Sequence, residues 1–184
     1  MKPIKELSRL ELAALVTETL KDAGIDVVLS GGSCVSIYSS EKYVSKDLDF
    51  IGVSLKSNRQ IAKAIQSLGF KNLPKNSRHF AHVETTFTLE FPSAPLMIGD
   101  EHIKLNAVGA IDTDLGTLRL LTPTDCVKDR LANHYYFGDK QCLEQALLVA
   151  KTHPINLTAL KQWHQNERQE QEYLSFLEKL KTVK

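Results

Sequence analysis

The chain has 184 residues, enough for one domain, or one domain with a helical appendage, that buries a substantial core. Hydrophobic residues make up 42% and charged residues 24% of the chain, which are ordinary values for a globular protein and exclude a largely disordered one. Lysine and arginine exceed aspartate and glutamate by 23 to 22, so the molecule as a whole lacks the basic field of tight, nonspecific nucleic-acid binders.

The N-terminal segment predicts an amphipathic helix. Apolar residues broadly follow a helical stripe from position 7 to position 20, and Gly24 lies where such a helix would end. The segment holds no unbroken apolar run, so we expect no secretory signal, no membrane span and a cytoplasmic location. The odd number and wide spacing of the cysteines favour reduced, buried thiols. These cysteines are Cys34, Cys126 and Cys142.

The middle of the chain shows the alternating strand and helix patterns of an α/β core. The β-branched run at 25–30 (IDVVLS) is typical of a buried strand, and the segment after its two glycines favours a helix. The run at 46–53 (KDLDFIGV) alternates with a period of two, and helical spacing returns over 58–70. Three further strand-like runs follow, at 86–91, 102–111 and 116–121.

A change of pattern at Thr122 predicts a second, helical part of the chain. Thr122 suits a helix N-cap and Pro123 the first helical position, and this helix should end near Gly138. The pattern stays helical beyond that glycine. We therefore expect an α/β core over residues 1–121 and a C-terminal helical subdomain over residues 122–184, packed against each other.

Two aspartates on one predicted strand are the first candidates for chemistry. Alternate side chains of a strand point to opposite faces, so Asp47 and Asp49 share one face. Leu48 and Phe50 then share the apolar face. Like charges held this close repel unless a cation lies between them, and magnesium prefers such hard oxygen ligands. The alternative is that the two aspartates form an ordinary exposed face of a strand.

A later strand offers a third carboxylate. In the run 87–91 (FTLEF), Glu90 and Thr88 share the polar face of the predicted strand. Nucleotide-transferring sites commonly hold two metal ions roughly 3.5–4 Å apart, which three carboxylates would suit. An exposed strand residue without any such role is the alternative for Glu90.

The glycine pair between the first predicted strand and the helix after it suits an anion. Backbone N–H groups point outward at a helix N-terminus, and small residues such as Gly31 and Gly32 let a phosphate approach the main chain. Ser33 would add a hydroxyl donor to the same phosphate or cap the helix. A tight turn between strand and helix explains the same glycines without any ligand.

These residues resemble a known family. The segment 30–50 (SGGSCVSIYSSEKYVSKDLDF) is similar to the signature of the nucleotidyltransferase superfamily that includes DNA polymerase β, and more narrowly to its AbiEii-like abortive-infection toxins. In that branch two glycines and a small hydroxyl residue precede a Ser-x-Asp-Leu-Asp-Phe strand, which residues 45–50 match. The segment 121–133 (LTPTDCVKDRLAN) is similar to a helix opening of the same branch. The matching positions there are Thr122, Pro123, Asp125, Asp129, Arg130 and Leu131.

The resemblance implies a mixed β-sheet flanked by helices, and transfer of a nucleotide from a nucleoside triphosphate to a hydroxyl or phosphate acceptor. Asp47 and Asp49 would then bind Mg²⁺, and Glu90 would be the third acid and a candidate base. Either Arg130 or Lys128 would reach the triphosphate, although both also suit a solvated helix face. The resemblance further implies a toxin that modifies RNA or another target, and an antitoxin as its partner.

The chain departs from the branch at three places. Tyr43 stands where an arginine is usual. Arg130 stands where a lysine is usual, so a planar, bidentate guanidinium replaces the point charge of an ammonium group. The charged residues of the following helix are represented only by Asp139 and Glu144. Two other functions therefore stay open: a catalytically inactive domain that binds a nucleotide or a partner, and an enzyme that transfers a nucleotide to an antibiotic.

Two further groups of polar residues are predicted to play no part in the chemistry. Asp112 and Asp114 form a second Asp-x-Asp, but their surroundings (DTDLGT) are typical of a hairpin turn. His79 and His82 are three residues apart without helical periodicity or a nearby cysteine, so we expect no zinc site there.

Overall fold

The computed structural model of the protein describes residues 2–53, 57–74 and 76–182. Its centre is a seven-stranded mixed sheet with the strand order β3-β4-β5-β2-β1-β9-β8. The predicted α/β class, with a mixed sheet, flanking helices and a helical C-terminal part, is confirmed. The strands of this sheet are β1 Val27–Ser30, β2 Asp47–Gly52, β3 Lys71–Leu73, β4 Asn76–Ala81, β5 Thr88–Glu90, β8 Gly109–Thr113 and β9 Gly116–Leu120.

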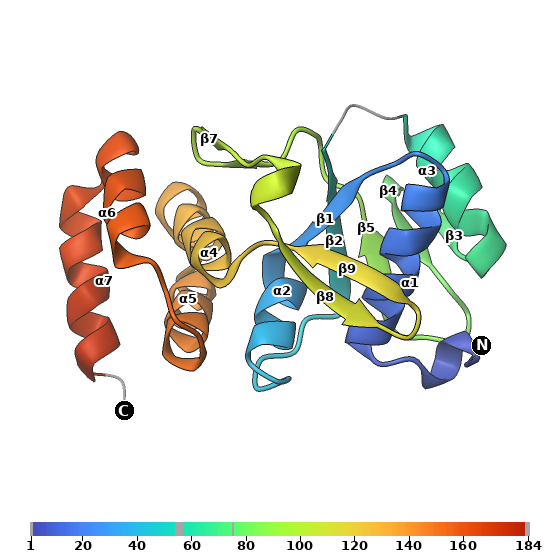
Figure 1. Cartoon of the computed structure of the whole chain (residues 1–184), viewed down its shortest axis with the longest axis horizontal. Coiled ribbons are helices and arrows are strands. Elements are labelled where there is room, and N and C mark those ends of the chain that lie inside the picture. The colour runs from blue at the N-terminus through green and yellow to red at the C-terminus, as the bar shows by residue number, and fades with distance from the viewer. Residues whose placement is uncertain (1, 54–56, 75, 183–184) are drawn as a thin grey trace.

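Helices flank the sheet and form a separate layer at its far end (Figure 1). Helix α1 packs on β1, β9 and α3, whereas α2 packs on β2 and against α4 and α5. Helices α6 and α7 lie outside α4 and α5, at the opposite end of the molecule from α3. The helices are α1 Arg9–Asp22, α2 Gly31–Tyr38, α3 Asn58–Ile65, α4 Pro123–Phe137, α5 Lys140–Thr152, α6 Leu157–Asn166 and α7 Glu170–Thr182.

Several local predictions about helix ends, a hairpin and the cysteines are confirmed. The Thr122 hydroxyl accepts a hydrogen bond from the third residue of α4, Pro123 is the first residue of that helix, and Gly138 ends it at a φ of 69°. The hairpin predicted at DTDLGT is present, with Asp114 in the turn that joins β8 to β9 and Asp112 in strand β8, where it pairs with Thr117. All three cysteines are free and buried. The boundary proposed between residues 121 and 122 stays a prediction.

Other local predictions are wrong in detail. Residues 102–111 do not form one strand, because the hairpin of β6 Met97–Ile98 and β7 Glu101–His102 ends there and a 3-10 turn, Leu105–Ala107, precedes β8. The turn keeps Leu105 and Val108 partly packed on the core, so apolar periodicity alone did not reveal it. Helix α2 includes both glycines in its first turn instead of following them.

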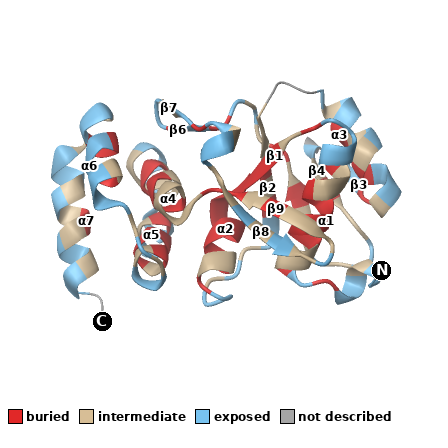
Figure 2. Cartoon of the chain, viewed as in Figure 1, coloured by how far each residue is buried: buried red, intermediate tan, exposed pale blue. Residues whose placement is uncertain are grey.

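The core is continuous from the sheet into the helical layer. Figure 2 shows the buried residues concentrated in β1, α1, α2 and the facing sides of α4 and α5. On the apolar face of the sheet, Leu48, Phe50, Leu89 and Phe80 are almost wholly inaccessible to solvent. This packing fixes β2 and β5 side by side, with their other face available for polar residues. None of the helices in the described part has the length and apolar character needed to span a bilayer.

Candidate active site

The predicted acidic residues lie on adjacent strands and share one face of the sheet. Strands β2 and β5 are parallel neighbours in which Asp47 pairs with Thr88 and Asp49 with Glu90. Strand β1 ends beside them, because Ser30 pairs with Asp49 on the other side of β2. The period-two alternation therefore places all three carboxylates on the face opposite Leu48. The N-terminus of α2 begins at this same edge.

Close packing accounts for both glycines at the start of α2. Gly31 has a φ of 66°, and a Cβ atom there would lie 2.9 Å from Cγ of Asp49. A Cβ atom on Gly32 would lie 3.1 Å from the Ser45 hydroxyl oxygen and 3.3 Å from the Tyr43 ring. Only glycine lets the Asp49 carboxylate approach the first turn of the helix this closely. A contact between either glycine and a phosphate stays a prediction.

The Asp49 carboxylate lies where negative charge is costly. Burial, reinforced by the neighbouring carboxylate of Glu90, raises the pKa of Asp49 to about 7. The guanidinium of Arg130 acts in the opposite direction on this pKa, so its charge reaches the same place. A bound cation would relieve this repulsion and would draw on the type of ligand that magnesium prefers.

The carboxylates contact neighbouring side chains more than one another. The hydroxyl of Thr88 donates a hydrogen bond to Asp47, and Nε2 of His79 lies 3.1 Å from a carboxylate oxygen of Glu90. Nδ1 of His79 is buried and has no hydrogen-bond partner among the described residues. No group of three or more His, Cys, Asp or Glu side chains in that part of the chain is arranged to hold a metal ion. The three carboxylates are of the ligand type that magnesium prefers, and they lie on one face of the sheet. They do not form a closed ligand cage in the part of the chain that the structure describes.

The two cations proposed to reach the triphosphate lie in different surroundings. Nζ of Lys128 is buried and lies 2.8 Å from Glu101 and 3.2 Å from Asp125, so it links α4 to the β6–β7 hairpin. Arg130 pairs with Asp129 at 2.6 Å and keeps its charge close enough to Asp49 to affect the pKa of that residue. Both roles stay predictions, and the geometry favours Arg130.

The Ser33 hydroxyl does not cap the helix, which was one of the two contacts considered from the sequence. It is fully buried, donates to the main-chain carbonyl of Asp47 and accepts a hydrogen bond of 2.9 Å from Arg9. It does not cap α2, whose N-cap residue is Ser30. A direct bond between this hydroxyl and a phosphate would require both partners to be given up, and its place in nucleotide binding stays a prediction.

Arg9 is a residue near the site that the sequence reasoning missed. Its buried guanidinium bonds Ser33, pairs with Glu41 at 2.9 Å and lies 4.8 Å from the ring centre of Phe87. These three contacts connect α1 to α2, to the loop before β2 and to the residue before β5. Arg9 therefore fixes the segments that present Asp47. The sequence pattern that could have indicated its burial is the helical spacing of Arg9 from the buried residues of α1, Leu12, Ala13 and Val16.

Tyr43, which replaces the arginine expected from the resemblance, has a hydroxyl whose pKa is influenced by two arginines. Burial raises the pKa of the Tyr43 hydroxyl, whereas Arg130 and Arg9 both act to lower it. The basic contact expected at position 43 is thus missing from the loop, but positive charge from α1 and α4 is present close by.

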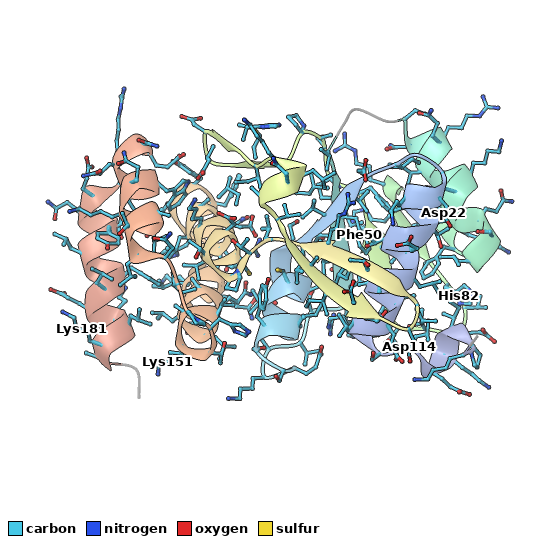
Figure 3. All side chains as sticks on the ribbon, in the orientation of Figure 1. Asp22, Phe50, His82, Asp114, Lys151 and Lys181 are labelled. Atoms are coloured by element: carbon cyan, nitrogen blue, oxygen red, sulfur yellow. The ribbon has the colours of Figure 1, made fainter. Side chains whose placement is uncertain are left out.

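The other polar pairs lie away from this face. Figure 3 shows Asp114 at the outer end of the β8–β9 hairpin, well separated from Phe50 in the middle of the sheet. Asp139 caps α5 by accepting a hydrogen bond of 2.9 Å from the main chain of Gln141. His82 packs on Phe70 instead of joining His79 in a metal site. That Asp112 and Asp114 play no part in the chemistry stays a prediction.

The comparisons with known proteins support the fold. The chain is similar to the solution structure of the antibiotic-resistance factor ANT(2'')-Ia, an aminoglycoside nucleotidyltransferase. The likeness covers 88% of this chain and 91% of that one, with a TM-score of 0.52 and 11% sequence identity. No protein-family model matches the chain, and no curated protein matches it in sequence.

The fold is that of a nucleotidyltransferase. At 11% identity the likeness extends to the arrangement of the elements and not to individual residues or substrates. The AbiEii-like branch therefore rests on the sequence motifs of residues 30–50 and 121–133 alone. Any assignment of activity must come from the residues on the face shared by β2 and β5.

Proposed function

We propose that the protein is a magnesium-dependent nucleotidyltransferase that moves a nucleoside monophosphate from a nucleoside triphosphate to a hydroxyl or phosphate acceptor. The observation that carries this proposal is the position of Asp47, Asp49 and Glu90 on one face of two adjacent strands, beside the N-terminus of α2. The nucleotidyltransferase fold is a second, independent support.

Each residue has a defined task in this proposal. Asp47, Asp49 and Glu90 would hold Mg²⁺, which when bound lowers the pKa of an attacking hydroxyl and neutralises the departing diphosphate. The N–H groups at the start of α2 would face the phosphates, because a helix N-terminus favours an anion. Arg130 would bind the triphosphate as a planar, bidentate donor once it exchanges Asp129 for phosphate oxygens.

The bond changes follow from this placement. An acceptor oxygen would attack the α-phosphorus, the bond from that phosphorus to the bridging oxygen would break, and diphosphate would leave. Glu90 or solvent would take the proton of a hydroxyl acceptor. The contact with His79 keeps the Glu90 carboxylate on the same face of the sheet as Asp47 and Asp49. Arg9 and Ser33 would serve as positioning residues for Asp47.

Two acceptors have separate support. The motif shared with AbiEii-like toxins favours RNA or another cellular target, a toxin role and a neutralising antitoxin. The neighbour ANT(2'')-Ia is an antibiotic-resistance factor, which favours an antibiotic acceptor. The departures from the toxin branch at Tyr43 and Arg130 favour a third function, a nucleotide-binding or partner-binding domain without catalysis.

Label transfer tests the proposal. Purified protein with Mg²⁺ and each of the four α-labelled triphosphates should transfer label to cellular RNA or to an aminoglycoside. Asp47→Asn should lower the rate at least 100-fold, because it removes a ligand of the reacting centre. Asp112→Asn, in the exposed hairpin, should leave the rate unchanged.

The acceptor that becomes labelled decides between the toxin and antibiotic functions. Absence of transfer with all four nucleotides, together with no thermal shift from any of them, would contradict the enzyme and support the binding domain.

A further inference from the structure

A long stretch of the chain carries basic residues and no acidic ones. Between Asp49 and Glu84 the sequence has six lysines and arginines but neither aspartate nor glutamate. The chain as a whole has nearly equal numbers of the two, so this stretch is a local departure from the average. Its described part includes the end of β2, α3, a 3-10 turn at Gln66–Leu68, β3 and β4. Helix α3 lies at the end of the molecule opposite to α6 and α7 (Figure 1).

Three basic residues of this stretch meet at a surface depression. Arg59 and Lys63 of α3 and Lys71 of β3 line a shallow hollow of about 580 Å³, together with the amides of Gln66 and Asn72. We call these five residues the basic edge. These residues are exposed on α3, on the 3-10 turn Gln66–Leu68 and on the edge strand β3.

The three cations of the basic edge differ from those near the candidate active site. Arg9, Lys128 and Arg130 each pair with a carboxylate at less than 3 Å. Arg59, Lys63 and Lys71 form no ion pair with any carboxylate in the described ranges. Their charge is thus uncompensated within that part of the chain, which favours an anionic partner from outside.

The basic edge is separate from the site on β2 and β5. Asn72 pairs with Phe80, Phe80 with Leu89, and Leu89 with Leu48, so the hollow lies three strands from β2. At roughly 4.8 Å per strand this separation is about 14 Å. Phe80 also belongs to the apolar face, opposite to the acids. A small ligand cannot reach both places, whereas a polymer that passes around the sheet edge can.

We propose that the basic edge binds the phosphate backbone of RNA. Lysine, arginine, asparagine and glutamine are the side chains that contact phosphate and sugar groups. The amides of Gln66 and Asn72 would add contacts to the 2′-hydroxyl groups of RNA. An acidic protein fits less well, because protein interfaces are enriched in exposed aromatic residues, and Phe70 and Phe80 in this hollow are only 2% and 1% exposed.

Binding to a fluorescein-labelled, unstructured RNA 20-mer, followed by fluorescence anisotropy at several salt concentrations, tests this proposal. Three phosphate contacts predict a slope of about −2 in a plot of log affinity against log salt. The triple variant Arg59→Glu, Lys63→Glu, Lys71→Glu should weaken binding at least tenfold. Neither Mg²⁺ nor a triphosphate is present, so failure here leaves the proposed transfer activity untouched.

A second triple variant controls for overall charge. Lys151→Glu, Lys161→Glu, Lys179→Glu removes three exposed lysines from α5, α6 and α7 and changes the net charge by the same six units. Lys151 lies on the helical side of the molecule, far from α3 (Figure 3). This control should bind RNA within threefold of the wild type. Circular dichroism and thermal unfolding would verify that both variants are folded.

Three results would overturn the proposal. They are equal loss of affinity in both triples, no measurable RNA binding by the folded wild-type protein, and binding of polyglutamate as tightly as the RNA.

Discussion

Asp49→Asn is expected to stabilise the metal-free protein at pH 8, although it removes a proposed metal ligand. The pKa of Asp49 is about 7 in the folded protein against an ordinary value of 3.8. Because the folded state disfavours the ionised form, stability is lost as the pH rises from about 4 to about 7. A difference of about three pKa units corresponds to at most ~4 kcal/mol. Asparagine stays neutral throughout and avoids this cost.

Urea unfolding in EDTA at pH 4 and pH 8 measures this effect. The gain in unfolding free energy of Asp49→Asn over the wild type should be near zero at pH 4 and about 2–4 kcal/mol at pH 8. Asp112→Asn, at an exposed position of strand β8, should show no difference at either pH. Nucleotide transfer by Asp49→Asn should be lost. A variant less stable than the wild type at pH 8 would show that the folded protein stabilises this carboxylate instead.

Gly31→Ala is expected to destabilise the protein more than an alanine at any open glycine of similar conformation. A positive φ costs an alanine about 1–2 kcal/mol. The new Cβ atom would also overlap the Asp49 carboxylate and force that side chain to move. We expect a total loss of about 2–4 kcal/mol of unfolding free energy, and weaker cation binding because Asp49 is displaced.

Gly24→Ala is the matched control. Gly24 has a φ of 72°, close to the 66° of Gly31, and a Cβ atom there would meet nothing within 4 Å. This variant should lose only the unfolding free energy that a positive φ costs an alanine, and it should bind cations as the wild type does. Chemical unfolding of both variants gives the comparison. Equal losses of unfolding free energy in the two variants would mean that the close approach of Asp49 to α2 adds nothing to the effect of Gly31→Ala.

The sequence predicted the parts of the fold that depend on local chemistry. Thr122, Pro123 and Gly138 mark the ends of α4 through capping and backbone conformation, which act within one helical turn. The alternation of Asp47 and Leu48 indicated correctly which face of β2 is buried, since the period of a strand needs no partner. The same rule predicted that Glu90 lies on the polar face of β5, opposite to Leu89.

The remaining features depend on contacts between distant residues. That β2 and β5 are parallel neighbours is decided by packing between segments about forty residues apart, which no local pattern encodes. The partners of Ser33 and Lys128 could not be foreseen, because Arg9 and Glu101 come from other elements. For the same reason, Gly31 could be read as a phosphate-binding residue but not as the residue against which Asp49 packs.

Cation binding is the most direct test of the central claim, that the three acids on the face of β2 and β5 hold divalent metal with a nucleotide. Mn²⁺ can be titrated by electron paramagnetic resonance with a non-hydrolysable triphosphate, in the wild type and in two double variants. We expect nucleotide-dependent Mn²⁺ binding to be lost in Asp47→Asn, Asp49→Asn and kept in Asp112→Asn, Asp114→Asn. Unchanged Mn²⁺ binding in the first double variant would contradict the account.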